Sequence, residues 1–290
     1  MRKYLKMGFI ALMLITISAN SKAEENLQIR GSDTMVNLIQ RMAEVYMEKY
    51  PEKKVAVTGG GSGTGIAGLR NRTVDIANSS REMKGRELVD SKAKGVDPVL
   101  IVVGVDCITI VVNESNKVDK LTNAQLGAIF RGDIVNWKEV GGDDMPITLY
   151  GRQSNSGTFV QFREDVLKSD YSDEMRRMNG NSQIIESVKN DKSGIGYVGL
   201  GHAKHSTGSK VLKIATMEGE EYIDPTVLKT DEVKKYSIIR TLIQYTNGKP
   251  EGSTKDFIEF ELSPEGQKVC EEMGFLPLNE EYAKQNEGIF

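Results

Sequence analysis

Strand-like and helix-like segments alternate along the chain, and this alternation restricts the fold more than any other feature. "NLQIR" (26–30) and "KKVAVT" (53–58) have the pattern of strands. Between them, one helical face collects five apolar side chains before Pro51 ends the segment: Met35, Leu38, Ile39, Met42 and Tyr46. Because a strand–helix–strand order favours parallel pairing with helices on both faces of the sheet, the sequence predicts an α/β fold.

The pattern restarts after a long apolar run, "VLIVVGVDCITIVV" (99–112). Helices are predicted over 122–130, 159–168 and 182–190, and strands over 146–151 and 194–199. This restart predicts two α/β lobes. Residues 201–234 carry little periodic signal and are predicted to be surface turns and strands, which would expose His202 and His205.

The first 23 residues have the pattern of a secretory signal peptide. They combine a basic start, an apolar run over 8–17, and small residues at Ser21 and Ala23. The run is shorter than the ~20 residues that span a bilayer. We therefore expect cleavage after Ala23 and an exported, periplasmic protein.

The charge of the chain limits its partners. The formal net charge is −3 at pH 7 and becomes more negative once the basic leader is removed. An acidic balance argues against nucleic acid or an acidic membrane face as partner. A small anion remains compatible, because backbone N–H groups and one arginine can bind it locally.

Residue types that carry catalysis or metal binding are few. The histidines are His202 and His205, and the cysteines are Cys107 and Cys270. An oxidising compartment would permit a disulfide, but nothing in the spacing pairs the two cysteines, and two buried free thiols are favoured. No metal site, no cofactor and no enzymatic activity are predicted.

Four polar loops follow predicted strands: 31–35 ("GSDTM"), 59–65 ("GGGSGTG"), 78–81 ("NSSR") and 151–158 ("GRQSNSGT"). In an open α/β sheet, ligands bind beyond the carboxyl ends of the strands. The N-terminus of a helix collects unpaired N–H groups that favour an anion, and Arg152 adds a planar fork of donors. A single such loop could simply cap its helix through Ser156 or Thr158. Four together can surround one small ion.

Two other interpretations concern the second loop. "GTGIAG" (63–68) matches the dinucleotide pattern G-x-G-x-x-G, but it follows the second strand rather than the first, and an exported protein seldom meets a nicotinamide cofactor. Ser62 resembles a nucleophile, yet Thr64 stands where G-x-S-x-G needs its second glycine. Dinucleotide binding and hydrolysis are therefore weaker alternatives than anion binding.

Several motifs in sequence resemble one family. They are "GSDTM", "GGGSGTGIAGL", "DIANSSR", "LTNAQLGAIFRGDIVNWKEVGG", "GRQSNSGT", "GIGYVG" and "SPEGQKVCEEMGFLPL". In this order they resemble the periplasmic phosphate-binding proteins of the phosphate-specific (Pst) ABC transporter, over nearly the whole chain after the leader. The resemblance implies a two-lobed, clamshell (type II) fold, each lobe a mostly parallel sheet flanked by helices. Lobe one would comprise 24–106 plus 240–290, lobe two 107–239, and the ligand would lie in the cleft between them.

The resemblance also implies a ligand set. Phosphate would be bound by Ser32, Asp33, Thr34, Met35, Ser62, Gly63, Ser80, Arg152, Ser156, Gly157 and Thr158. Where some family members place an aspartate that accepts the proton of the phosphate, this chain has Ser80, followed by Arg81. The acceptor is thus either Ser80 or Asp33, and capping of its own helix is the favoured interpretation of Asp33.

The function implied by the resemblance is binding of inorganic phosphate and its delivery to the permease subunits of an ABC transporter. A monomer without a nucleic-acid partner is expected. Two alternatives stay open from the sequence: a secreted phosphate-handling hydrolase, and the same fold binding another oxyanion such as sulfate or molybdate.

Overall fold

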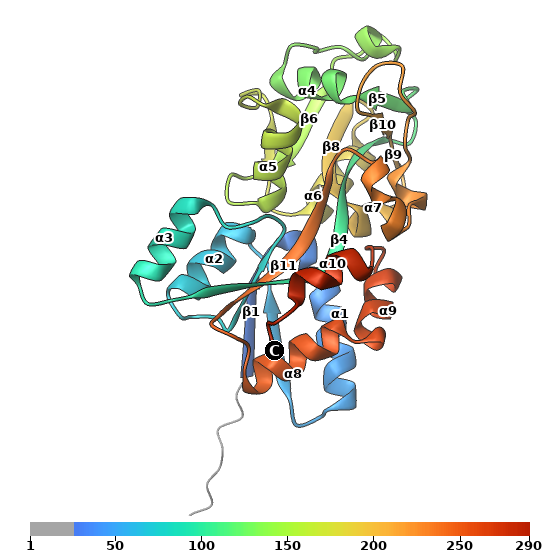
Figure 1. Ribbon diagram of the computed structural model, residues 1–290. Helices are drawn as coiled ribbons and strands as arrows, with labels where there is room; N and C mark the ends of the chain where they lie inside the picture. The colour runs from blue at the N-terminus through green and yellow to red at the C-terminus, as the bar shows by residue number, and fades with distance from the viewer. Residues whose placement is uncertain (1–25) are drawn as a thin grey trace, which may run out of the picture.

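The computed structural model describes residues 26–290, which form two groups of helices and strands joined by two long strands (Figure 1). The predicted signal peptide falls outside the described residues. The first group contains β1 (Asn26–Gly31), α1 (Asp33–Lys49), β2 (Lys54–Thr58), α2 (Ser62–Arg70), β3 (Ile76–Ser79), α3 (Gly85–Ala93), α8 (Gly252–Leu262) and α9 (Pro264–Glu272).

The second group is built from the middle of the chain. It contains β5 (Lys120–Thr122), α4 (Asn123–Arg131), β6 (Thr148–Arg152), α5 (Gly157–Phe162), β7 (Arg176–Met178), α6 (Asn181–Asn190), β8 (Gly194–Gly199), α7 (Leu200–Lys204), β9 (Ser209–Val211) and β10 (Lys213–Ala215). A π-helical turn, Arg163–Leu167, continues α5, and short 3-10 helices lie at Trp137–Val140, Pro225–Val227 and Thr230–Lys235.

The long strands are β4 (Pro98–Asn113) and β11 (Ile239–Asn247), and α10 (Glu280–Ala283) lies close to β4 near the chain end (Figure 1). Within residues 26–290, nine strands join one sheet in the order β2-β1-β3-β11-β4-β8-β6-β7, with β9 also paired to β4. β5 and β10 form a separate parallel pair. The sheet is therefore continuous from one group to the other.

The strand directions agree with the predicted alternation in the outer parts of the sheet. β1 is parallel to β2 and β3, and β6 is parallel to β7 and β8. β4 and β11 are antiparallel to each other, and each is antiparallel to the strand on its other side. This follows from the chain path, because β4 carries the chain into the second group and β11 brings it back.

The predicted amphipathic helix is α1, and all five of its predicted apolar residues are buried. They pack in one core with side chains of α8 and α9, including Phe257 and Cys270. The helix ends at Lys49, two residues before Pro51, which has no N–H to continue it. The core of the first group thus fixes the orientation of the N-terminus of α1.

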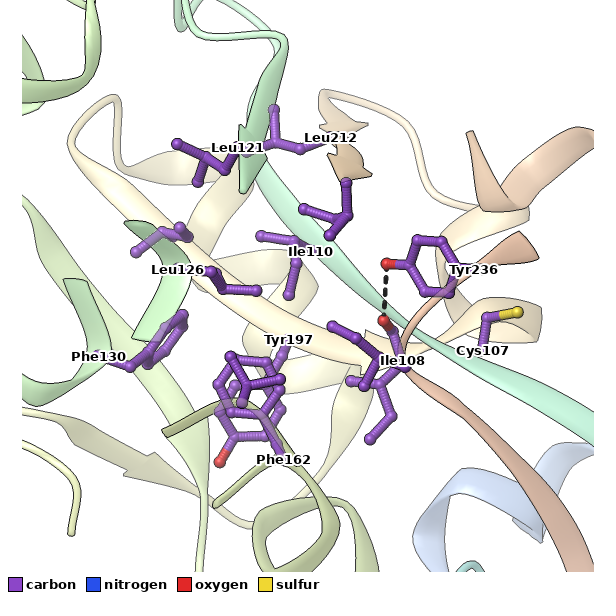
Figure 2. Close-up of a cluster of buried hydrophobic side chains, with 14 of the residues drawn as sticks. Cys107, Ile108, Ile110, Leu121, Leu126, Phe130, Phe162, Tyr197, Leu212 and Tyr236 are labelled. Atoms are coloured by element: carbon purple, nitrogen blue, oxygen red, sulfur yellow. Dashed lines mark hydrogen bonds between the residues drawn. The ribbon is translucent and has the colours of Figure 1, made fainter. Parts of the chain in front are cut away.

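A second core fills the second group (Figure 2). Phe162 stacks on Tyr197 with ring centroids 4.4 Å apart, and Phe130 meets both rings. The Tyr236 hydroxyl donates to the Ile108 carbonyl at 3.0 Å. Cys107 lies in this core, and both it and Cys270 are buried free thiols whose pKa is raised by burial, which confirms the prediction.

No helix in the part of the chain that the structure describes is long and apolar enough to cross a bilayer.

Glu261 is a fully buried carboxyl on α8. Its Oε1 accepts a hydrogen bond from Gln244 Nε2 at 3.0 Å, whereas Glu261 Oε2 and Gln244 Oε1 have no partner within residues 26–290. Burial raises the pKa of Glu261 well above its ordinary value. The side chain therefore resists ionisation in the folded protein.

We expect Glu261→Gln to increase the free energy of unfolding at pH 7 by about 1–3 kcal/mol, the usual cost of an unpaired buried polar group. The new side-chain amide can donate to Gln244 Oε1. Glutamine is also neutral in both states, whereas Glu261 must keep its proton in the folded protein at a pH where the unfolded chain releases it. A raised pKa contributes stability below the unfolded-state value of about 4.3 that is lost as the pH rises toward the folded-state value. The gain should therefore shrink below about pH 4.

Denaturant titrations across this pH range measure the effect. Glu271→Gln, at an exposed position of α9, is the control and should change little. An unchanged or lower unfolding free energy of Glu261→Gln at pH 7 would contradict the interpretation.

Candidate functional site

The N-termini of three helices meet between the two groups. Thr34 lies in the first turn of α1, Ser62 begins α2, and Thr158 lies in the first turn of α5. The hydroxyl oxygens of Thr34 and Thr158 are 3.0 Å apart although the residues belong to different groups. Because helix N-termini present unpaired N–H groups, their convergence favours a negatively charged ligand.

Gly157 brings the third loop against the first group. A Cβ at this position would lie 2.4 Å from Ser62 Oγ and 2.6 Å from Ser80 Oγ. Ser62 Oγ in turn accepts a hydrogen bond from the Ser80 N–H at 3.1 Å. A glycine is needed at this close approach. The predicted loops 59–65, 78–81 and 151–158 therefore meet at one point.

Arg152 is a fully buried cation at the end of β6. Its backbone N–H donates to the Tyr197 hydroxyl at 3.0 Å, and its Nη2 donates to the Asn179 carbonyl at 3.0 Å. Its Nη1 lies 3.3 Å from Asp33 Oδ1, and its Nε has no partner within residues 26–290. Burial lowers the pKa of Arg152, and Asp33 opposes that change. A buried guanidinium with an unused N–H is a ready donor for an anion.

Asp33 corrects a prediction. Ser32 occupies the N-cap position of α1 without a side-chain cap hydrogen bond, and Asp33 is the first helical residue. Its Oδ1 accepts hydrogen bonds from the Asn181 backbone N–H at 2.8 Å and the Asn181 side chain at 2.6 Å, besides Arg152. The helix-capping interpretation is wrong, because the carboxylate reaches across to the second group instead.

The other predicted ligand residues lie at the same junction with different contacts. Ser32 is buried, and its N–H donates to the Asn78 carbonyl at 2.8 Å. The Met35 side chain is in the first core, and its N–H is 3.2 Å from the Ser32 carbonyl. Ser156 caps α5 by accepting from the Phe159 N–H at 3.4 Å, as the capping alternative predicted for this loop.

Asn155 ties the second loop to the third. Its carbonyl accepts the Gly63 N–H at 2.9 Å, and its side-chain amide donates to the Gly60 carbonyl at 2.9 Å. Gly63 is therefore engaged in a contact between the two groups. Arg81, beside Ser80, is held by Glu87, whose oxygens accept its Nη1 and Nη2 at 2.7 and 2.8 Å.

His202 corrects a second prediction. It is 9% exposed, and its Nε2 is 3.0 Å from the Thr34 carbonyl, so the predicted exposure is wrong. His205 is exposed, as predicted. Because a carbonyl only accepts, Nε2 carries the proton that joins α7 to the start of α1. Burial lowers the pKa of His202, against the opposing effect of Asp33.

The sequence reasoning missed Asp106 and Arg240 as parts of this site. They face each other on β4 and β11, both buried, with Asp106 Oδ2 accepting from Arg240 Nη2 at 2.8 Å. Arg240 also donates to the hydroxyls of Thr34 and Thr158. One signal was available, because Asp106 is the single charged residue in the apolar run 99–112.

Two cavities adjoin the junction. One of about 390 Å³ lies beside Arg240 and is lined by residues 81–84 of the first group and Val160, Gln161 and Glu164 of the second. Another of about 540 Å³ lies beside His202, between α1 and α9 on one side and α6 and α7 on the other. Among residues 26–290, no cluster of three or more His, Cys, Asp or Glu side chains could hold a metal ion.

Comparisons with known proteins agree with this architecture. The model of the PBP superfamily domain matches residues 16–265. The phosphate-binding protein PstS of Borreliella burgdorferi is 32% identical, over 92% of this chain and 96% of that protein. The protein of the same name from Pseudomonas aeruginosa is 31% identical, over 90% of this chain and 85% of that protein.

Solved structures show the same fold. A substrate-binding protein from Clostridium perfringens, solved with bound phosphate, has a TM-score of 0.77 and 26% identity, covering 88% of this chain and 100% of that one. An ABC-type phosphate transport receptor from Vibrio cholerae has a TM-score of 0.68 and 28% identity, covering 87% and 100%. The chain therefore belongs to the PBP superfamily and, within it, to the family of the phosphate-binding proteins PstS.

The buried, neutral His202 should make folding sensitive to acid. Its lowered pKa means that the unfolded chain takes up a proton below about pH 6.5 that the folded protein does not. The free energy of unfolding should thus fall with decreasing pH, by up to about 1.4 kcal/mol per pH unit from this group. In His202→Gln, whose amide can replace the Nε2 donor, the slope between pH 6.5 and 5 should be smaller, by up to this amount.

Denaturant titrations at several pH values measure the slope. His205→Gln, at the exposed position, should keep the slope of the wild type. Equal slopes in all three proteins would rule out His202 as the source.

Proposed function

We propose that this protein binds inorganic phosphate between two lobes outside the cytoplasm and delivers it to the permease of an ABC transporter. The observation that carries the proposal is the meeting of three helix N-termini, together with the buried Arg152, which pairs with the first residue of α1 and whose Nε–H has no partner within residues 26–290. Hydroxyl and backbone donors together with the buried Arg152 guanidinium suit a small tetrahedral oxyanion.

The relatives support phosphate as that anion. Two curated relatives over 30% identical are named phosphate-binding proteins, and structural neighbours are a phosphate transport receptor and a protein solved with phosphate bound. These names describe proteins that bind phosphate for transport rather than enzymes. Capture and delivery, without chemical change of the phosphate, is therefore the activity.

The proposed lobes are 24–106 plus 240–290 and 107–239. The division is supported by two large cores, one around α1, α8 and α9 and the other around α4 and β8, although Leu276 and Tyr282 of the segment 240–290 pack in the second core. Phosphate would lie between Ser32, Asp33, Thr34, Met35, Ser62, Gly63 and Ser80 of lobe one and Arg152, Ser156, Gly157 and Thr158 of lobe two. Ligand contacts from both lobes would favour a closed clamshell.

The cellular location of this activity depends on the predicted signal peptide. A signal peptide cleaved after Ala23 would direct the protein to the periplasm. The protein would act there as a monomer. The permease subunits would then receive the closed, loaded form.

Calorimetry of the purified, phosphate-stripped protein tests the function directly. Phosphate, sulfate and molybdate are titrated separately under the same conditions. Tight binding of phosphate alone supports the proposal. Absence of phosphate binding, or tighter binding of another oxyanion, overturns it.

Arg152→Ala should weaken phosphate binding at least about tenfold, because a hydrogen bond to a charged group contributes about 1.5–3 kcal/mol. The dissociation constant from calorimetry is the measurement. Arg177→Ala, at an exposed position of β7, is the control and should bind as the wild type does. Thermal unfolding of both variants without phosphate separates a loss of binding from a loss of fold. Unchanged affinity would remove Arg152 from the site.

Phosphate should be preferred over sulfate, because phosphate near neutral pH keeps a proton that an acceptor in the site can bind, and sulfate has none. A site built to pair with such a proton can reject the analogue by roughly 10⁴–10⁵. Replacement of the acceptor should reduce the ratio of phosphate to sulfate affinity at least about tenfold. The two candidate substitutions are Asp33→Asn and Ser80→Ala.

The ratio is the useful quantity, because Asp33 also pairs with Arg152 and its loss should affect both anions. Competition titrations on the wild type and the two variants measure it. An unaltered ratio in both variants would show that the acceptor lies elsewhere.

A further inference from the structure

Arg240 is held in place by a carboxylate from the neighbouring strand. It faces Asp106 in the register of β11 and β4, and its side chain is 2% exposed and that of Asp106 0%. Asp106 Oδ2 accepts from Arg240 Nε at 2.9 Å and from Nη2 at 2.8 Å, while Asp106 Oδ1 accepts the Leu200 N–H at 2.8 Å. The guanidinium is thereby fixed on the two strands that connect the groups.

The same guanidinium contacts both threonines of the site. Its Nη1 donates to Thr158 Oγ1 at 2.9 Å, and its Nη2 donates to Thr34 Oγ1 at 3.2 Å. Thr34 belongs to α1 and Thr158 to α5, which lie in different groups. Arg240 is thus a common partner of two side chains that meet across the junction.

These contacts determine how the hydroxyls can act. A guanidinium has N–H donors and no acceptor, whereas a threonine hydroxyl has one proton and two acceptor positions. Each threonine oxygen therefore accepts from Arg240, and its own proton is directed elsewhere. In this structure one of the two protons joins the hydroxyls, whose oxygens are 3.0 Å apart. Both protons can be donated to an anion at the junction when that hydrogen bond is exchanged for bonds to the anion.

Arg240 contributes little direct electrostatic attraction for an anion. Asp106 balances Arg240 just as Asp33 balances Arg152. A neutralised pair adds little net positive potential, but it can hold donors in a fixed orientation.

We propose that Arg240 is a positioning residue for phosphate, which it serves by orienting the Thr34 and Thr158 hydroxyls as donors. The inference rests on the proposed phosphate function. A purely structural role is the competing explanation, in which the ion pair only joins β4 to β11.

Arg240→Lys separates the two roles. Lysine keeps a positive charge next to Asp106, so a structural role that needs only charge balance should be retained. Its single ammonium lacks the planar fork needed to contact Asp106 and both hydroxyls. We expect phosphate affinity to fall by about tenfold or more, because hydrogen bonds from a charged donor are strong. Thermal unfolding without phosphate should remain a single transition, because Asp106 keeps a cationic partner, and its midpoint measures the structural share of the loss.

Arg30→Lys is the matched control. Arg30 also donates to a threonine hydroxyl, Thr58 Oγ1 at 3.2 Å, but at an exposed position on β1. Its affinity for phosphate should equal that of the wild type.

A double-mutant cycle tests the route through the threonines. In a Thr158→Val background, Arg240→Lys should cost a smaller factor in affinity than in the wild type, because one of its two hydroxyl partners is gone. Equal factors in the two backgrounds, or wild-type affinity of Arg240→Lys, would overturn the inference. If Arg240→Lys does not fold, the amide pair Asp106→Asn/Arg240→Gln takes its place in the cycle.

Failure of the proposed function gives a different result. A wild type that binds no phosphate refutes that function, whereas a wild type and Arg240→Lys that bind phosphate equally refute only the positioning role.

Discussion

The antiparallel pairing of β4 with β11 is the interaction on which the rest of the structure depends. It runs from Ile239 opposite Cys107 to Asn247 opposite Pro98, and β4 then continues into the second group to pair with β8 and β9. Both groups are therefore attached to the same two strands. This attachment places the loops before α1 and α2 opposite the loop before α5, where the candidate ligand residues meet.

The buried charges at this junction are balanced in pairs. Arg152 has Asp33 and Arg240 has Asp106, as expected because a buried charge without a partner is costly. These four side chains together carry no net charge. The affinity for an anion must then come from oriented donors and helix N-termini rather than from excess positive charge. An acidic chain, with a formal charge of −3, can hold an anion on these terms.

The sequence predicted what depends on neighbouring residues. Alternating patterns predicted β8 and the apolar face of α1, and polar loops at strand ends predicted the grouping of Thr34, Ser62 and Thr158. What it could not predict depends on packing between distant segments. Asp33 is hydrogen-bonded to Asn181, which is 148 positions away in the sequence. Arg240 is hydrogen-bonded to Asp106, at a separation of 134 positions. His202 lies in a polar stretch typical of surface turns, and its burial depends on contacts with distant residues, among them Thr34 of α1 and Phe275.

The arrangement of donors limits where the proton of a phosphate can be accepted. Arg152 and Arg240 only donate, and each of the Thr34 and Thr158 hydroxyl oxygens accepts from Arg240, which leaves the hydroxyl proton for donation. Ser80 Oγ lies 3.4 Å from Ser62 Oγ, and a serine can rotate its proton toward an anion that needs a donor. An ionised carboxylate cannot make this change, and the three hydrogen bonds to Asp33 from Arg152 and Asn181 all fall on Oδ1. Strict rejection of sulfate would therefore require Asp33 as acceptor, whereas Ser80 alone would permit only weak discrimination.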